Sequence, residues 1–310
     1  TSVSKQYTPK VFLKFIRLPF HAMGTPCEVQ LYGSSRIKAR RVAESVIADV
    51  QRLEALYSRY LESSLVHRIN QAAATGGEIQ LDSESASLFD YAQTCFEQSD
   101  GLFDITSGIL RKAWDFKKAE LPNPKTIESL LDKVGWQRLN WDSPVLAFPQ
   151  PGMEIDLGGV VKEYAVDRAA DICREQGVKH GMINLGGDIH IIGPHPDGSP
   201  WLVAIRNINK EESPLQMLKL SSGALASSGD YERCITLDGV RYGHILNPRT
   251  GWPVKCMAAV SVVSDLCVVA GSAATIGMLK QEQGKSWLAE FGLPYLWLDV
   301  DGKSGGSLIP

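Results

Sequence analysis

The stretch EIDLGGVVKEYAVDRAADICREQG, residues 154–177, combines a glycine pair with an acid, a lysine and a helical pattern. Its first part, EIDLGG, is typical of a strand that ends in a turn. Its second part, VVKEYAVDRAADICREQG, repeats apolar residues at helical spacing and predicts a helix that stops at Gly177. The helical pattern places Lys162 and Glu163 mostly away from the apolar face. The stretch therefore predicts a strand–turn–helix unit.

The junction between this strand and this helix is suited to an anion. Gly158 and Gly159 carry no Cβ, so a ligand can approach their backbone N–H groups closely. A helix N-terminus favours negative charge, and Lys162 in the first turn adds a positive charge. These features are typical of a phosphate or pyrophosphate site. The short motif alone leaves an ordinary tight turn beside a solvated lysine equally open.

A second glycine pair lies in NLGGDIHIIG, residues 184–193, again after an apolar run. Two such turns close together in the chain indicate a backbone that is shaped around a ligand. Asp188 and His190 follow the second turn and could be ligands. An acid at a strand end and a half-exposed histidine are the alternative, which we favour from the sequence.

The third polar cluster is GDYERCITLDGVRYGHILNPRTGWPV, residues 229–254. Its Asp-Gly pair at 238–239 predicts a hairpin. After the hairpin, His244, Arg249 and Thr250 fall close together around a turn stiffened by proline. A histidine beside an arginine and hydroxyl groups is typical of an acid/base or phosphate site. His244 is therefore a candidate functional residue, although a lone histidine is usually structural.

The rest of the chain predicts an α+β fold. Further helices are expected at 36–57, 84–99, 124–134 and 267–280, and strands at 27–33, 181–192, 201–206, 259–263 and 294–300. The first 20 residues predict an extended arm that enters a strand. This order of elements favours α+β layers over strict βαβ alternation.

Composition excludes several classes of protein. With 310 residues, 44% of them hydrophobic, and a net charge of −3, the chain can bury a full core and has no broad nucleic-acid surface. The longest apolar stretch, Met257–Gly271, is interrupted by Asp265 and is too short to cross a bilayer. The N-terminus shows no basic-then-apolar leader.

The six cysteines form no CxxC pair and have neither zinc-site nor dense disulfide spacing. They predict buried free thiols, which favours a reducing compartment.

Seven blocks of the sequence, in order, resemble the FAD:protein FMN transferases, the ApbE flavin transferases. They are AMGTPCEVQLYG (22–33), SRYLESSLVHRIN (58–70), GLFDITSGIL (101–110), DLGGVVKEYAVDRA (156–169), NLGGDIHIIG (184–193), HILNPRTG (244–251) and VVAGSAATIGML (268–279). Because the blocks span nearly the whole chain, the resemblance implies one domain over residues 1–310. It also implies a two-lobed α+β architecture with the FAD site in the cleft between the lobes.

The resemblance implies an activity as well. Members bind FAD with a divalent metal, usually Mg²⁺, near the pyrophosphate. They break the pyrophosphate, release AMP and attach FMN to a Thr or Ser of an acceptor protein, and some instead hydrolyse FAD. The expected partner is thus an acceptor protein and not a nucleic acid, and no oligomeric state is implied. Family resemblance favours the bacterial cell envelope or periplasm, with the cytoplasm as the alternative.

Residue roles are implied by matching position. The positions that match FAD contacts are Met23, Tyr60, Thr106, Ser107, Gly108, Asp156, Lys162 and Ile245. His244 matches a general base on the acceptor hydroxyl. The backbone of Gly159 and the hydroxyl of Thr275 match metal ligands. Each residue has an ordinary alternative: Met23 and Ile245 as core, Tyr60 as an exposed aromatic, Thr106 as a helix cap, and Thr275 bonded to its own helix backbone.

Three positions depart from the family pattern. Members usually have an acid four residues before the threonine, where this chain has Gly271, and a glycine where it has Glu163. Leu61 likewise replaces a usual aspartate. Asp265 is nearly three helical turns from Thr275 and cannot substitute for the missing acid. Glu163 either supplies the missing charge or repels the pyrophosphate.

Three functions follow from these departures. The favoured one is an active flavin transferase with a rebuilt metal site. The alternatives are a flavin-binding protein without catalysis and a homologue that binds no flavin, since a fold does not by itself carry a function. Because Mg²⁺ prefers carboxylate oxygens, the sequence predicts that Gly271→Asp tightens Mg²⁺ binding.

Overall fold

The computed structural model of this chain describes residues 13–118, 120–207, 213–230 and 234–309. Its largest element is an eight-stranded sheet in which all neighbouring strands are antiparallel, in the order β1-β2-β6-β7-β10-β13-β14-β15. The strands are β1 Lys14–Ala22, β2 Thr25–Gly33, β6 Gly181–Leu185, β7 Asp188–Gly193, β10 Gly223–Gly229, β13 Met257–Ser264, β14 Tyr295–Asp299 and β15 Ser304–Gly305. Of the expected N-terminal arm, residues 1–12 lie outside the described residues.

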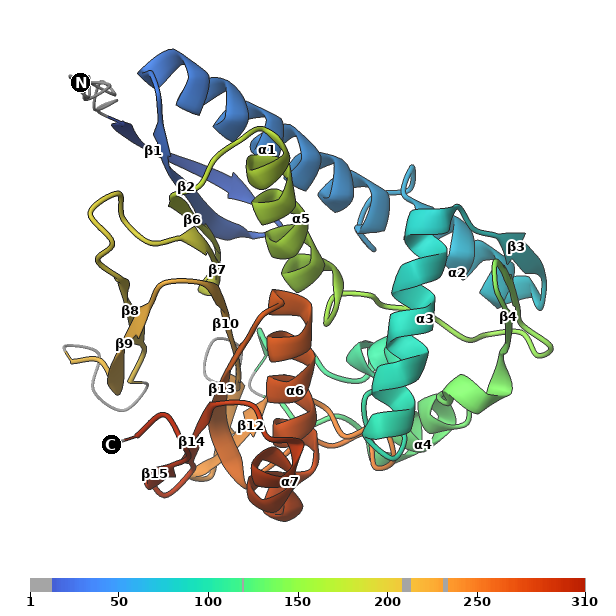
Figure 1. The fold of residues 1–310 in the computed structure, drawn as a ribbon. Helices are drawn as coiled ribbons and strands as arrows, with labels where there is room; N and C mark the ends of the chain where they lie inside the picture. Colours follow the sequence, from blue (N-terminus) through green and yellow to red (C-terminus); the bar gives the residue numbers. More distant parts are fainter. Residues whose placement is uncertain (1–12, 119, 208–212, 231–233, 310) are drawn as a thin grey trace, which may run out of the picture.

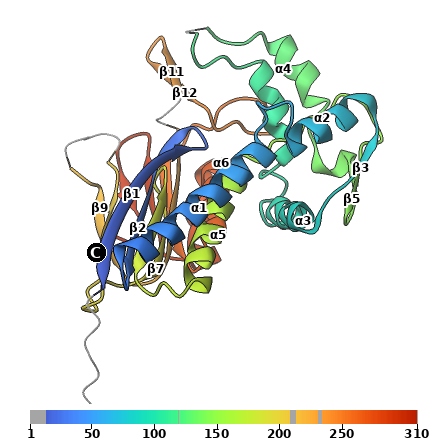
Figure 2. The ribbon, with the colours of Figure 1, turned by 90° about the horizontal axis from the view of Figure 1, so that it is seen from above.

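Four helices cover one face of this sheet (Figures 1 and 2). They are α1 Arg36–Tyr57, α5 Val161–Glu175, α6 Cys267–Leu279 and α7 Gly284–Phe291. The main hydrophobic core lies between these helices and the sheet. Helix α6 is apolar on most sides because it is enclosed between sheet, α5 and α7.

A hairpin of β8 Trp201–Ile205 and β9 Gln216–Leu220 packs on the other face. Its Trp201 contributes to a second apolar cluster with Ile189 and Ile191 of β7. Because side chains alternate along a strand, Asp188 and His190 of β7 point to the helical face instead. This alternation brings two polar side chains to the level of α5.

The residues between α1 and α5 form a separate group of elements, at the right in Figure 1. The group comprises α2 Leu65–Thr75, α3 Ser83–Gln98, α4 Pro124–Leu131, the 3-10 helices η1 Ile105–Lys112 and η2 Trp136–Arg138, and a small sheet of β3 Glu78–Gln80, β5 Val145–Ala147 and β4 Asn140–Asp142. The hairpin of β11 Cys234–Leu237 and β12 Val240–Gly243 packs against this group, where Ile235 contacts Trp114 and Ile127. A short 3-10 helix, η3 Gln281–Gln283, links α6 to α7.

The α+β class is confirmed, and so is the hairpin at Asp238 and Gly239. The stretch 181–192 forms two strands that turn at Gly186 and Gly187, both at positive φ. Helix α4 ends at Leu131, three residues before its expected end. Helices α2 and α7 were not predicted. Among the described residues, no helix has both the length and the apolar character needed to cross a membrane.

The predicted strand in EIDLGG is wrong. Residues 153–157 have no strand partner in the part of the chain that the structure describes. The N–H of Ile155 donates to Oδ1 of Asn70 (2.7 Å) and its carbonyl accepts from Nδ2 of the same side chain (3.0 Å). The N–H of Asp156 donates to the carbonyl of Ile105 (2.9 Å). A side-chain amide of α2 thus takes the place of a neighbouring strand, which a local pattern cannot reveal.

Candidate functional site

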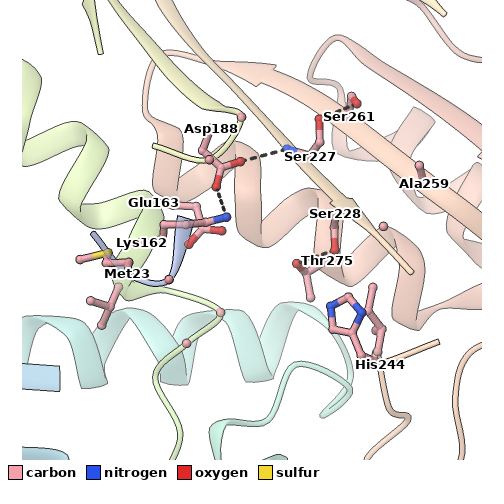
Figure 3. A pocket seen from close by; sticks show the side chains of 18 of the residues that line it. Met23, Lys162, Glu163, Asp188, Ser227, Ser228, His244, Ala259, Ser261 and Thr275 are labelled. Atoms are coloured by element: carbon pink, nitrogen blue, oxygen red, sulfur yellow. Dashed lines mark hydrogen bonds and ion pairs between the residues drawn. The ribbon is translucent and has the colours of Figure 1, made fainter. Parts of the chain in front are cut away.

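A cavity of about 1120 Å³ lies between the large sheet and the segment 102–111, and it extends to the β8–β9 hairpin (Figure 3). Its lining comes from the β1–β2 turn, the residues after α1, η1, the start of α5, the β6–β7 turn, the end of β10, residues 244–246 and α6. The cavity therefore collects side chains from nearly the whole length of the chain.

The predicted site residues that line this cavity are Met23, Tyr60, Ser107, Gly108, Asp156, Gly159, Lys162, His244, Ile245 and Thr275. Thr106 is not among the lining residues. It is fully buried, and its hydroxyl donates to Asp104 (2.7 Å) and accepts from the N–H of Gly135 (2.7 Å). Thr106 thus holds η1 in place from behind.

The β1–β2 turn brings Met23 to the cavity. Met23 and Gly24 both have positive φ, 52° and 70°, as a two-residue hairpin turn requires. A methionine in this conformation is strained and needs support from its surroundings. Glu54 of α1 provides it by accepting the N–H of Met23 (2.6 Å). Glu54 lines the cavity as well, although no local sequence pattern distinguishes it from an ordinary helix residue.

The carboxylate of Asp156 is held by two arginines. Arg59 donates to Oδ2 and the N–H of Gly158 donates to Oδ1 (2.9 Å), while Arg111 lies 3.6 Å from Oδ2. A Cβ at Gly108 would lie 2.4 Å from the Cβ of Asp156, so only glycine lets η1 approach this closely. We expected the N–H groups of both Gly158 and Gly159 to be open to a ligand. The N–H of Gly158 is already bonded to Asp156, so only that of Gly159 can be.

Arg59 also orders Tyr60. Its Nη2 donates to the hydroxyl of Tyr60 (2.7 Å), and its guanidinium lies 4.8 Å from the centre of that ring. The ring itself is 77% exposed. An exposed aromatic ring at the rim of a cavity can stack on a planar ligand.

Lys162 is not simply solvated, because it forms an ion pair with Asp188. Its Nζ lies 2.8 Å from Oδ2 of Asp188, which is 2% exposed. Oδ1 of Asp188 accepts the N–H of Ser227 (3.3 Å). Burial would lower the pKa of Lys162, but the charges of Asp188 and Glu163 raise it above its usual value. The lysine stays positively charged, and Asp188 belongs to the site.

Glu163 faces inward, against the prediction that it lies away from the buried face of its helix. It is 8% exposed, and its Oε2 has no hydrogen-bond partner among the described residues. A Cβ at Gly271 would lie 2.5 Å from Cγ of Glu163 and 3.1 Å from its Oε1. Burial, and then the nearby Asp188 carboxylate, raise the pKa of Glu163 well above its usual value.

The hydroxyl of Thr275 and the imidazole of His244 also line the cavity, and Thr275 lies between Lys162 and His244 (Figure 3). Oγ1 of Thr275 donates to Oγ of Ser228 (3.2 Å), so its hydroxyl is directed to β10. Figure 3 shows the imidazole of His244 directed into the cavity from the same side as Thr275 and Ser228. The site thus has a cationic and carboxylate end at Lys162 and an imidazole end at His244, with the hydroxyl of Thr275 between them.

His190 lies outside this site, and the expected half-exposed histidine was wrong. It is 1% exposed, with Nδ1 2.8 Å from Oδ1 of Asp167 and Nε2 2.8 Å from Nη2 of Arg174. Its neighbours on α5 therefore bury it in a structural network.

The oxygen atoms at the carboxylate end can accept a hard cation. Within the described ranges, no group of three or more His, Cys, Asp or Glu side chains could bind a metal ion. Mg²⁺, however, often uses only one or two carboxylates and keeps several waters. Glu163, Asp188 and the hydroxyl of Thr275 are donors of this kind on the cavity wall. The unpartnered, buried Oε2 of Glu163 makes this a place where a bound cation would be stabilised.

Known proteins resemble the chain in both sequence and structure. A family model described as the ApbE family matches residues 23–297. A FAD:protein FMN transferase of Chlamydia pneumoniae is 32% identical over 249 residues, which cover 77% of this chain and 77% of that protein. The crystal structure of the ApbE protein of Thermotoga maritima superposes with a TM-score of 0.86 at 30% identity, over 95% of this chain and 97% of that one. The apo form of the Pseudomonas stutzeri flavinyl transferase ApbE gives a TM-score of 0.85 at 25% identity, over 96% of each chain.

Proposed function

The chain belongs to the ApbE family, and from this premise we propose that it transfers FMN from FAD to a Thr or Ser of an acceptor protein, with release of AMP. Its relatives are named as transferases, so membership of the family supports a transferase activity. The acceptor residue, the metal and the roles of individual side chains are part of the proposal.

One observation carries the proposal: a single cavity is lined by Lys162 and Arg59 at one end and by His244 at the other. Its volume of about 1120 Å³ is slightly above the roughly 300–1,000 Å³ of most ligand pockets, which leaves room for a dinucleotide. Cationic groups bind the pyrophosphate, and an imidazole in the same cavity accepts a proton.

The chemistry then has a simple balance. His244 takes the proton from the acceptor hydroxyl, whose oxygen attacks the FMN phosphorus of FAD. The bond between the two phosphates breaks, and AMP leaves with the electron pair. Lys162 and Arg59 stabilise the negative charge on the phosphate oxygens throughout. Tyr60 and Met23 contact the flavin or the adenine.

A divalent cation, for which we propose Mg²⁺, fits the oxygen donors described above. It would supply further charge stabilisation at the phosphates. By resemblance the hydroxyl of Thr275 and the backbone of Gly159 would hold it. Both line the cavity, and Thr275 points its hydroxyl away from its own helix.

Two other functions remain as alternatives. Water in place of the acceptor hydroxyl would make the enzyme an FAD pyrophosphatase, and loss of the chemistry would leave a flavin-binding protein. For the location we propose the bacterial cell envelope, on family resemblance alone.

The direct test is chromatography of FAD incubated with the protein and a peptide that carries the acceptor threonine, with Mg²⁺ or with a chelator. We expect metal-dependent AMP in equal amount to flavinylated peptide. AMP and free FMN without peptide modification would establish hydrolysis, and intact FAD that elutes with the protein would establish binding only.

Substitution of the histidine tests its role in the same assay. We expect His244→Ala to lower the rate of peptide flavinylation by about 10²–10⁴-fold while FAD binding, followed by flavin fluorescence, is retained. The matched control is His21→Ala, since His21 is an exposed histidine on β1 outside the cavity. An unchanged rate in His244→Ala would remove His244 from the mechanism.

A further inference from the structure

The burial of the Glu163 carboxylate is energetically unfavourable. Most of its neighbours on the inward face of α5 are apolar, among them Ala165 and Val166, and the exception is the buried carboxylate of Asp167. A carboxylate that is more than nine-tenths buried is normally paired or bound to a metal. Oε2 of Glu163 nevertheless has no hydrogen-bond partner among the described residues, although the side chain lines the cavity. A buried carboxylate oxygen without a partner, on the wall of a cavity, indicates a site for a ligand.

Gly271 explains how Glu163 fits. Glycine inside a helix destabilises the fold by about 0.5–1 kcal/mol relative to alanine, so its presence here requires a structural explanation. Here the reason is space, because any Cβ at this position would overlap Cγ of Glu163 at 2.5 Å. The side chain of Glu163 on α5 thus occupies the volume that a side chain at Gly271 on α6 would fill.

The surroundings of Glu163 supply further oxygen atoms. Asp188 is a second buried carboxylate, and Lys162 is paired with it at 2.8 Å. Thr275 lies one helical turn after Gly271 on the same face of α6, and it lines the cavity. Figure 3 shows Glu163 beside Lys162 and Asp188, with Thr275 on the side toward His244. Glu163 and Asp188 thus place two carboxylates beside Lys162.

We propose that Glu163, seated over Gly271, is the carboxylate ligand of a divalent cation in this cavity, together with Thr275 and Asp188. The carboxylate is delivered from α5 instead of α6, to the same part of the cavity. The inference rests on the proposed function for the cation's role in catalysis, but binding of the cation can be measured without any reaction.

Mn²⁺ is a suitable probe, because the free ion can be counted by its electron paramagnetic resonance signal. The protein is titrated without FAD and with FAD. We expect Glu163→Gln, which keeps the shape and removes the charge, to weaken Mn²⁺ binding at least about tenfold. The double variant Glu163→Gly with Gly271→Asp moves the carboxylate to α6 and should restore binding. Glu154→Gln is the matched control, since Glu154 is equally buried, at 7% exposure, but does not line the cavity.

Thermal unfolding gives a second readout. A ligand that binds only the folded state raises its melting temperature. Mn²⁺ should therefore raise the melting temperature of the wild type and of Glu154→Gln, but not that of Glu163→Gln. Without metal, Glu163→Gln should melt no lower than the wild type, because a buried carboxylate is removed. This comparison separates loss of the cation from loss of the fold.

The outcomes distinguish this inference from the proposed function. Equal Mn²⁺ affinity in wild type and Glu163→Gln, or no Mn²⁺ binding by the wild type, would overturn the inference even if flavinylation proceeds. Loss of Mn²⁺ binding in Glu163→Gln would support it even if the wild type, assayed in parallel for AMP, leaves FAD intact. In the latter case only the proposed function fails.

Discussion

At the scale of single residues, Glu163 and Gly271 are complementary: one carries a long side chain inward and the other carries none. Each residue alone would destabilise the fold, since a buried carboxylate and a glycine within a helix are both unfavourable. Together they fill one volume. The sequence showed both departures from the family pattern but not that they touch, because they lie on different helices far apart in the chain.

This contact changes the expected effect of Gly271→Asp. A side chain added at 271 collides with Cγ of Glu163, so we expect the single variant to be destabilised by about 1–3 kcal/mol, with no gain in Mg²⁺ affinity. Combining it with Glu163→Gly should recover the stability. Urea denaturation of the wild type, both single variants and the double variant measures the coupling directly. A Gly271→Asp variant that is as stable as the wild type and binds Mg²⁺ more tightly by calorimetry would contradict the overlap.

The residue-level site was predictable only in part. Residues beside glycine turns, such as Asp156 and Lys162, could be identified because the glycine pair is visible in the sequence next to them. Arg59, Arg111 and Glu54 could not, since each acts through a partner distant in the sequence. Nothing local distinguishes such a residue from an ordinary surface charge.

At the scale of elements, helix α6 begins with a cap borrowed from another helix. Its own N-cap residue, Leu266, makes no side-chain hydrogen bond. Asp167 of α5 accepts the N–H groups of Cys267 (2.7 Å) and Val268 (2.9 Å) instead, and it also contacts Nδ1 of His190. One carboxylate thus joins α5, α6 and β7 beside the cavity.

Removal of this cap should be costly. We expect Asp167→Ala to lower the free energy of unfolding by about 3–5 kcal/mol, because it leaves two helix N–H groups and a buried histidine without their acceptor. Asp171→Ala, one turn further along α5 at an exposed position, should change it by less than about 0.5 kcal/mol. Urea unfolding followed by circular dichroism compares the two. Equal effects would mean that Asp167 does not cap α6.

Elements with strong internal periodicity were predicted well, and α1 has the expected bounds. Those that depend on distant partners were not. EIDLGG looked like a strand, yet its hydrogen bonds go to Asn70 and Ile105. The start of α6 was located from its apolar run, while the carboxylate that caps it stands about a hundred residues earlier.

At the scale of the whole molecule, the cysteines report on the core. All six are free, as predicted; four are buried, and Cys234 and Cys256 are partly exposed. Burial raises the pKa of Cys173 to about 12, and it raises that of Cys267 well above the usual value. Because the thiolate is the reactive form, buried thiols of this kind are inert at neutral pH.

Thiol titration should therefore show two classes. We expect an aromatic disulfide reagent at pH 8 to modify Cys234 and Cys256 within minutes, and the other four only after addition of denaturant. Cys234→Ser and Cys256→Ser should each remove one fast equivalent. Rapid reaction of all six thiols in the native protein would show that the core opens far more readily than its packing indicates.

The large sheet has a further consequence that lies in its connectivity. Strands β2 and β6 are neighbours, and the N–H of Tyr32 donates to the carbonyl of His180 (3.0 Å), so the chain leaves the sheet and returns to it at adjoining points. Everything from α1 to α5 is inserted between them. Pairing of β2 with β6 must close a loop of about 150 residues, and closure entropy grows only slowly with length, by about 0.6 kcal/mol per doubling. The length of this insertion therefore adds little to the entropic penalty of folding, but contacts between residues so distant in sequence form slowly. The cavity, which needs both the sheet and the inserted helices, should be among the last parts of the molecule to become complete during folding.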